Sequence, residues 1–212
     1  MRQTESHLRI AVLGANGGTG RHVVTTGLAR GHDVVALTRG GDVLPPAPGL
    51  SEVGWADVSD RDGLAAALAG ADVVISTLGG AAKGPTSVCT DAIRSVVPVM
   101  GALGVPRLIV VSAHGVLESH DRSLYARAVW AGVGEKLKDK ETMEPLITAS
   151  SLDWTIVRAP ALSNATASGP ARAGEHLPIR LWHSIGRADL AAFLVTEAER
   201  GDFVRRIVRV RA

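Results

Sequence analysis

The sequence is poor in cysteine and in net charge, and each shortage excludes a class of protein. Cys89 is the single cysteine among 212 residues, so no disulfide can form within the chain and no oxidising compartment is required. Metal binding is not expected, because the seven histidines and the one cysteine show no HxxxH or CxxC spacing. The net charge of +2 is too small to indicate nucleic-acid binding. The lack of a possible disulfide favours a cytoplasmic location.

Long apolar runs are also missing. No segment approaches the roughly 18 to 20 apolar residues that cross a membrane, and the first ten residues, MRQTESHLRI, lack the apolar stretch of a secretory signal. No membrane role is therefore expected. The chain does contain 46% hydrophobic and 21% charged residues, a balance typical of soluble globular proteins. Its length suits one domain that covers residues 1–212.

Short runs rich in valine and isoleucine alternate with segments of helical spacing. This alternation is typical of a parallel sheet covered by helices on both faces. Strands are expected at residues 8–13, 33–38, 51–55, 72–77, 107–112, 154–157 and 204–210. Helices are expected at residues 18–30, 60–69, 87–103, 124–150 and 187–199, and residues 159–174 are expected to form a loop. The predicted fold class is α/β: a single-domain Rossmann fold with a doubly wound, mostly parallel sheet.

A glycine-rich turn stands between the first expected strand and the first expected helix. There Gly14 permits a tight turn, Gly17 lets the backbone approach a pyrophosphate, and Gly20 permits close packing of the helix on the strand. Free N–H groups at the helix start attract phosphate. The turn therefore predicts a phosphate site, with a purely structural turn as the alternative. Its residues expected at a cofactor are Gly14, Asn16, Gly17, Gly18, Thr19 and Gly20.

The spacing GxxGxxG differs from the GxGxxG of standard dehydrogenases. It resembles the GATGxTG turn of the atypical short-chain dehydrogenase family, with Asn16 and Gly18 at the variable places. Arg39 ends the second expected strand, where NAD-specific proteins usually carry an acidic side chain. A guanidinium can pair bidentately with the ribose phosphate of NADP and stack on adenine. NADP(H) is therefore expected rather than NAD(H), with a solvated loop arginine as the alternative.

The resemblance continues along most of the chain. Asp57 and Val58 match the segment that lies beside the adenine in this family, and Leu78 and Gly79 belong to a match with the strand and turn under the cofactor. Further matches are VSAHG, SSLDWTIVRAP and IGRADLAAFLV. The likeness is to the biliverdin-IXβ/flavin reductase and NmrA-like branch, and it implies that Lys140 and Pro160 also contact the cofactor.

The family's Tyr-x-x-x-Lys pair is incomplete in this chain. Counting back from SSLDWTIVRAP places the lysine on Lys140 and the tyrosine on Lys136, whereas the only tyrosine, Tyr125, lies fifteen residues before Lys140. The lysine of that pair lowers the pKa of a phenol that exchanges a proton with the substrate, so its loss argues against classical alcohol dehydrogenation. Direct hydride delivery stays possible, because a flavin or quinone can take its proton from water.

Ser112 is expected to be the catalytic-site side chain. It ends the fifth expected strand, where open α/β sheets bind ligands, and it matches a family serine near the nicotinamide; the alternative is a hydroxyl that caps a turn. His114 is expected either to line the same pocket or to lie at the surface. Lys140 either touches the cofactor or pairs with Glu144 on a solvated helix. Arg187 is expected to anchor the last helix rather than to bind substrate.

Two functions fit these features. The first is an NADPH-dependent reductase of a small conjugated acceptor, and the second is a non-catalytic NADP(H) sensor similar to NmrA-like regulators. The missing tyrosine suits both. The volume above the nicotinamide distinguishes them, because a reductase needs an open apolar pocket there, whereas residues 159–174 could fill it in a sensor. A nucleotide-sugar epimerase or dehydratase would require the Tyr-x-x-x-Lys pair and a larger segment after Pro160.

Overall fold

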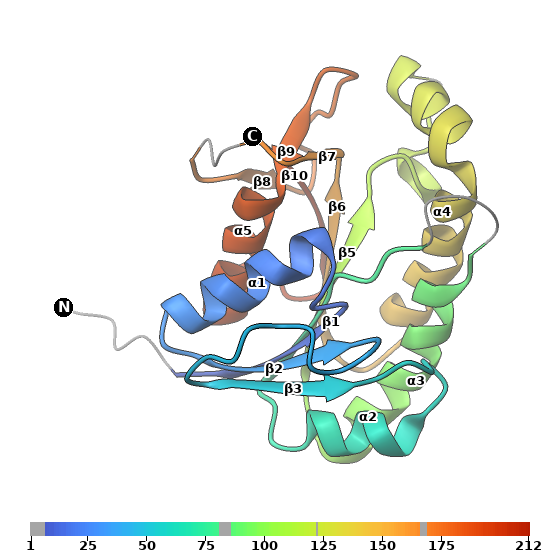
Figure 1. The fold of residues 1–212 in the computed structure, drawn as a ribbon. Helices are drawn as coiled ribbons and strands as arrows, with labels where there is room; N and C mark the ends of the chain where they lie inside the picture. Colours follow the sequence, from blue (N-terminus) through green and yellow to red (C-terminus); the bar gives the residue numbers. More distant parts are fainter. Residues whose placement is uncertain (1–6, 81–85, 122, 166–168) are drawn as a thin grey trace.

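The computed structural model describes residues 7–80, 86–121, 123–165 and 169–212, which fold into one large sheet between two layers of helices (Figure 1). The eight strands run in the order β3-β2-β1-β4-β5-β6-β10-β8. They are β1 (Arg9–Leu13), β2 (Asp33–Thr38), β3 (Leu50–Gly54), β4 (Val73–Ser76), β5 (Arg107–Ala113), β6 (Asp153–Ala159), β8 (Arg172–Gly174) and β10 (Arg206–Arg211). Every neighbouring pair is parallel except β10 and β8. The predicted α/β class and doubly wound, mostly parallel sheet are confirmed.

Helices cover both faces of this sheet. The helices are α1 (Gly18–Ala29), α2 (Arg61–Leu68), α3 (Val88–Leu103), α4 (Leu124–Thr148) and α5 (Arg187–Arg200). α1 and α5 lie together on one face, and the other three lie on the opposite face (Figure 1). In β1, Ile10 and Val12 pack into the core with α1 and α5, whereas Ala11 and Leu13 pack into the core of the opposite face. Because both faces of the strand are buried, its sequence is continuously apolar.

The expected helices and the seven longer strands are present, with ends shifted by a few residues. The expectation of a loop at 159–174 is wrong in part, because this segment contains the end of β6, the short strand β7 (Ala161–Ser163) and β8. β7 pairs with β9 (Ser184–Gly186) in a separate two-stranded sheet. Residues 166–168 of the segment, and residues 1–6 of the N-terminal stretch, lie outside the described residues.

The strand order fixes where a ligand can bind. β1 lies between β2 and β4, so the connections after β1 and β2 leave the sheet in different directions from those of β4 and β5. A crevice opens at such a switch point, beyond the carboxyl ends of the parallel strands. The glycine-rich turn after β1 and Ser112 on β5 both lie at this edge. In the described part of the chain, no helix has the length and apolar character needed to span a bilayer.

Candidate functional site

The turn after β1 is built by its glycines. Gly14 has a φ of +75°, and its carbonyl accepts a hydrogen bond of 2.9 Å from the N–H of Gly17. A Cβ on Gly20 would lie 2.2 Å from the Gly14 carbonyl oxygen, so only glycine lets α1 approach β1 this closely. Gly17 is the N-cap of α1 and gives no side-chain bond, which leaves the first N–H groups of the helix for a ligand. The turn fits a pyrophosphate.

A cavity of about 610 Å³ adjoins this turn, over the ends of β1 and β2. The predicted cofactor residues that line it are Gly14, Asn16, Gly17, Arg39, Asp57, Val58, Leu78 and Gly79. Hydrogen bonds from the hydroxyl and the N–H of Ser59 lower the pKa of Asp57. Trp55 also lines the cavity and is buried, although its sequence context indicates only a packing residue. The size and the lining suit an adenosine.

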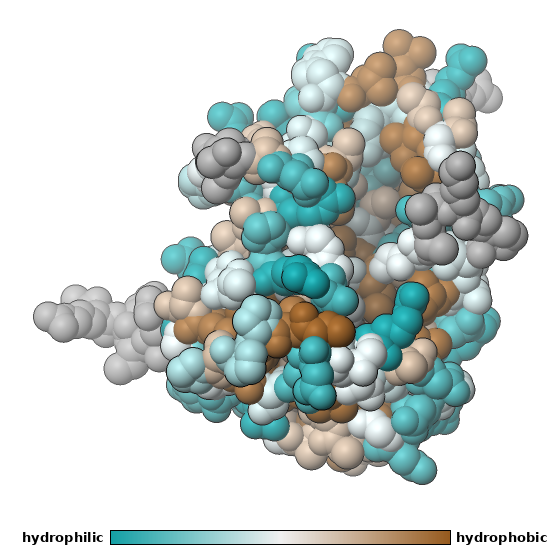
Figure 2. All heavy atoms as spheres, viewed as in Figure 1, coloured by the Kyte–Doolittle hydropathy of each residue, from teal (hydrophilic) through white to brown (hydrophobic). Residues whose placement is uncertain are grey.

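A second cavity, of about 490 Å³, lies over the ends of β4 and β5. The predicted residues that line it are Thr19, Leu78, Gly79, Ser112, Lys140 and Pro160. Thr77, Leu78 and Gly79 line both cavities, so the two form one cleft along the carboxyl edge of the sheet. Figure 2 shows hydrophobic side chains within the hollow between the central body and α4. Gly18 and Gly20, also predicted at the cofactor, are among the lining residues of neither cavity and shape the turn through the backbone.

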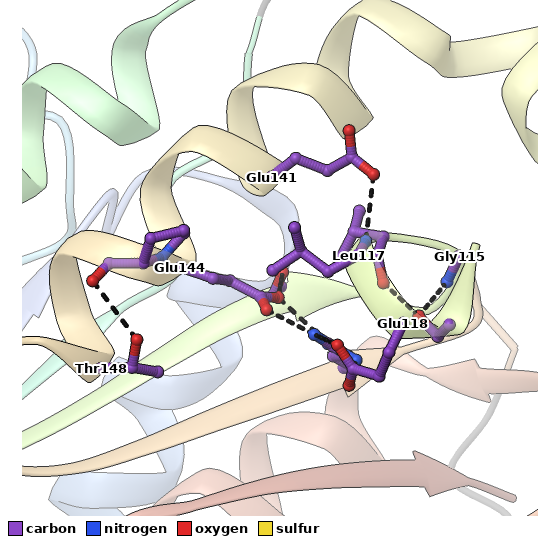
Figure 3. A network of polar contacts seen from close by, with 11 residues as sticks. Gly115, Leu117, Glu118, Glu141, Glu144 and Thr148 are labelled. Atoms are coloured by element: carbon purple, nitrogen blue, oxygen red, sulfur yellow. Dashed lines mark hydrogen bonds and ion pairs between the residues drawn. The ribbon is translucent and has the colours of Figure 1, made fainter.

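Ser112 is held by a buried ionic network. Its hydroxyl lies 2.6 Å from Oε1 of Glu144, and Glu144 also accepts bonds from Nε and Nη2 of Arg158 at 3.2 and 2.6 Å. Glu118 pairs with the same guanidinium from the other side (Figure 3). Burial alone would raise the pKa of Glu118, but the hydrogen bonds from Arg158 lower it. The Glu144 carboxylate can only accept hydrogen bonds, so the hydroxyl proton of Ser112 points to Glu144. The lone pairs of the Ser112 oxygen therefore remain free to accept a hydrogen bond from a ligand N–H.

Lys140 lies on α4 with its ammonium in the second cavity. The Nζ atom donates to the carbonyl of Leu78 at 3.0 Å and to that of Val111 at 2.8 Å. Its residue is 9% exposed. The alternative, in which Lys140 pairs with Glu144 on a solvated helix, is therefore wrong, because Glu144 is buried against Arg158. An ammonium has three hydrogens, so one remains for a ribose or an acceptor.

His114 and Tyr125 line the same cavity. Both are buried, with ring centroids 5.1 Å apart, so the alternative of a surface position for His114 is wrong. Tyr125 reaches the cavity from the first turn of α4, on the far side of a kink at Val133, where φ is −138°. The fifteen-residue spacing between Tyr125 and Lys140 does not indicate that the phenol reaches this cavity. Trp130, on the same helix, donates to the Gly115 carbonyl and is not among the residues that line the cavity.

The burial of His114 makes the free energy of unfolding depend on pH between about 4 and 6.5. Burial and then the charge of Arg209 lower the pKa of His114 from 6.5 to about 4, so between these values the unfolded chain is protonated while the folded protein is not. The contribution of neutral His114 to stability is complete above about pH 6.5 and is lost by about pH 4, a fall of about 3 kcal/mol. Urea unfolding across this range should show a shallower decline in the His114→Gln variant. Equal slopes would contradict the burial of a neutral imidazole.

Arg187 was expected to anchor the last helix, and the structure gives it a place in the cleft as well. It begins α5 and lines the second cavity. Its Nη1 donates to Oδ1 of Asn164 at 2.7 Å, and a Cβ on Gly18 would lie 2.8 Å from its Nε atom. The guanidinium therefore lies against the start of α1, where a phosphate would be held. No local sequence signal pairs Arg187 with Gly18.

Comparisons with known proteins agree with this cleft. The sequence pattern of the NAD(P)H-binding family matches residues 14–200. A 3-beta-hydroxysteroid dehydrogenase from Mycolicibacterium neoaurum is 30% identical over 121 residues, which are 51% of this chain and 33% of that protein. The chain thus matches only about a third of the length of that relative.

Several solved structures share the fold over nearly the whole chain. The anaerobillin reductase ChuY from Escherichia coli O157:H7 is 25% identical, with a TM-score of 0.77 and coverage of 95% of this chain and 96% of that one. A Streptococcus pneumoniae TIGR4 protein described as a candidate NADH-flavin reductase is 22% identical, with a TM-score of 0.76 and coverage of 96% and 99%. A short-chain dehydrogenase/reductase from Veillonella parvula is 18% identical, with a TM-score of 0.81 and coverage of 97% and 94%. The last two likenesses establish the fold alone.

The family match covers the glycine-rich turn, both cavities and α5. It confirms the resemblance to proteins that bind a nicotinamide cofactor, and the relatives above are consistent with the atypical short-chain dehydrogenase branch. The chain therefore belongs to the NAD(P)H-binding family.

Proposed function

We propose that this protein is an NADPH-dependent oxidoreductase that reduces a flat, conjugated acceptor such as a flavin or a quinone. The observation that carries the proposal is the open second cavity, which continues from the cofactor cavity and is lined largely by apolar groups, among them Val111, Leu137 and Leu162. A reductase needs such a pocket beside the nicotinamide. The reductase assignment of ChuY supports the same class of reaction.

Different residues of the cleft would bind different parts of the cofactor. The bound nicotinamide would supply the hydride, and the start of α1 together with Arg187 would hold its phosphates. Lys140 and Ser112 would orient the nicotinamide half, since one offers a hydrogen and the other offers lone pairs. The described part of 159–174 leaves the cavity open, with Pro160 and Leu162 at its wall. An open cavity favours turnover over a sensor.

The proposed preference for NADPH rests on Arg39 and on the hydrogen bonds that already hold the nearby carboxylate of Glu52. Arg39 is exposed at the end of β2 and lines the adenosine cavity. The carboxylate of nearby Glu52 accepts bonds from the N–H groups of Val43 and Leu44 and from the Thr38 hydroxyl. Burial alone would raise the pKa of Glu52, but these bonds lower it. Glu52 is thus occupied and is not presented to ribose hydroxyls.

Replacing Arg39 by alanine is expected to raise the KM for NADPH roughly 10- to 100-fold and to leave the KM for NADH nearly unchanged, because a charge-assisted bond to the ribose phosphate is lost. Steady-state oxidation of NADPH and NADH against a panel of flavins and quinones measures both values. The control is Arg200→Ala, which removes an exposed arginine from the far end of α5.

Two results would contradict the proposal. An equal rise in the KM values for NADPH and NADH in Arg39→Ala would contradict the proposed preference for NADPH. Tight binding of NADPH with no turnover across the whole panel would remove the reductase and favour an NADP(H) sensor.

A further inference from the structure

We propose that Tyr125 is a catalytic residue that donates a proton to the acceptor, with His114 positioning its phenol, and that the acceptor is a conjugated carbonyl or imine compound whose heteroatom must be protonated. This inference rests on the proposed reductase function. It assigns the role of proton donor to the single tyrosine of the chain, although this tyrosine does not stand at the Tyr-x-x-x-Lys spacing from Lys140. The sequence match puts Lys136 at the family's tyrosine position, whereas the fold brings a phenol into the cavity from another part of α4.

The proton-bearing side chains that line the cavity include Ser112, Lys140, Tyr125 and His114, together with Lys136, which lies partly exposed on α4. The Ser112 hydroxyl is bonded to Glu144, so it presents lone pairs to the cavity. Two of the three hydrogens of Lys140 are held by the carbonyls of Leu78 and Val111. Tyr125 and His114 differ from both, because neither side chain forms a hydrogen bond with any residue that the structure describes, apart from their mutual ring contact.

Burial makes these unsatisfied groups informative. Tyr125 is 4% exposed and His114 is 5% exposed, and Nδ1 of His114 is enclosed without a hydrogen-bond partner. The Tyr125 hydroxyl has no partner among the described residues either, but it is not an enclosed atom, so a ligand in the cavity can reach it and complete its hydrogen bonding. Both rings line the cavity beside the predicted nicotinamide position, so an acceptor bound there meets the phenol and the imidazole together.

The neighbouring structure holds this pair in place. Ser123 caps the first turn of α4 by accepting from the N–H of Ala126, and Trp130 ties the same half of the helix to the Gly115 carbonyl. The backbone N–H of His114 donates to the Ala159 carbonyl at 2.8 Å. The Cε1 atom of Tyr125 lies 3.8 Å from the position that a Cβ on Gly115 would take. The phenol and the imidazole therefore have fixed positions relative to β5.

Both groups are neutral at neutral pH. Burial raises the pKa of Tyr125 to about 12, so the phenol carries its proton there, although the same burial makes it a weaker acid than a free phenol. Burial and the charges of Arg209 and Arg158 outweigh those of Asp121 and Glu118 and keep His114 neutral. A neutral imidazole offers one acceptor and one donor nitrogen, and its ring packs against the phenol ring.

The reaction balances in atoms and electrons. The acceptor gains a hydride from NADPH, as the C–H bond of the nicotinamide breaks and a bond to hydrogen forms at one end of the conjugated system. The displaced π pair moves to a carbonyl oxygen or imine nitrogen at the other end, and that atom takes the proton of Tyr125. The phenolate then regains a proton from water entering the open cavity, leaving NADP⁺ and the reduced acceptor.

The first test is the Tyr125→Phe variant, which removes only the hydroxyl. With NADPH and menadione, a naphthoquinone, we expect kcat to fall about 100-fold while the dissociation constant of NADPH, followed by its fluorescence, stays within twofold. His114→Gln should lower kcat about tenfold with little change in KM. Thr142→Val, which removes an exposed hydroxyl from the same helix outside the cavity, is the matched control.

A binding measurement keeps the test independent of turnover. With NADP⁺ bound, quenching of tryptophan fluorescence by menadione should show affinity about tenfold weaker in Tyr125→Phe than in the unaltered protein, because one hydrogen bond to the carbonyl is lost. Retention of kcat within threefold, or unchanged menadione affinity, would overturn the role of Tyr125. Failure of the unaltered protein to oxidise NADPH would instead remove the reductase function, and the binding comparison would still decide whether the phenol contacts the acceptor.

Discussion

Replacing Arg158 by methionine is expected to lower the free energy of unfolding by about 3 to 5 kcal/mol. Arg158 is 0% exposed and supplies the cation that faces Glu144, whose side chain is 1% exposed. Without the guanidinium, a buried carboxylate is left with only the Ser112 hydroxyl. Glu118 adds little to this loss, because 62% of its side chain is exposed and water can replace the ion pair. Urea unfolding at neutral pH measures the change.

A second variant separates the buried charge from simple loss of packing. In Arg158→Met combined with Glu144→Gln, the buried group is neutral, so the double variant should recover more than half of the lost stability. Arg205→Met serves as the control, because Arg205 is exposed and lies 3.5 Å from Asp153, and it should change stability by less than about 1 kcal/mol. Equal destabilisation in the single and double variants would contradict the uncompensated charge as the cause.

Most of the sheet could be predicted because its strands are buried on both faces. Continuous apolar runs such as β4 and β5 leave a clear signal, and the glycines Gly31 and Gly104, at positive φ after α1 and α3, mark the helix ends. β7, β8 and β9 have three residues each, which is too short for an alternation to show. Their position depends on pairing between distant segments, so the sequence indicated only a loop for β7 and β8 and gave no assignment for β9.

In the candidate site, too, some residues could be predicted from the sequence and others could not. The glycine-rich turn and Arg39 could be predicted, because their roles depend on a local strand-turn-helix context. Tyr125 and Arg187 could not be assigned, because their places in the cleft depend on the kink in α4 and on the packing of α5 against α1. The burial of Arg158 is also invisible in the sequence, where an arginine at a strand end is most often solvated.

Replacing Gly20 by alanine is expected to weaken NADPH binding by at least about 100-fold and to lower the free energy of unfolding by about 1 to 3 kcal/mol. The new Cβ would lie 2.2 Å from the Gly14 carbonyl oxygen and 2.8 Å from the Ala15 Cα atom. Backbone atoms cannot rotate away as a side chain can, so α1 and the turn must separate. That separation moves the N–H groups at the start of α1 from the position where they hold a pyrophosphate. Fluorescence titration with NADPH and urea unfolding measure the two effects.

Gly101→Ala is the matched control, since Gly101 also lies within a helix but a Cβ there meets nothing within 4 Å. Alanine at that position should stabilise the protein by about 0.5 to 1 kcal/mol and leave NADPH affinity unchanged. The contrast tests the packing directly, because both substitutions add one methyl group to a helical glycine. If Gly20→Ala kept full NADPH affinity, the close contact of α1 with the turn would not be what holds the phosphate site together, and the assignment of the pyrophosphate to the start of α1 would have to be given up.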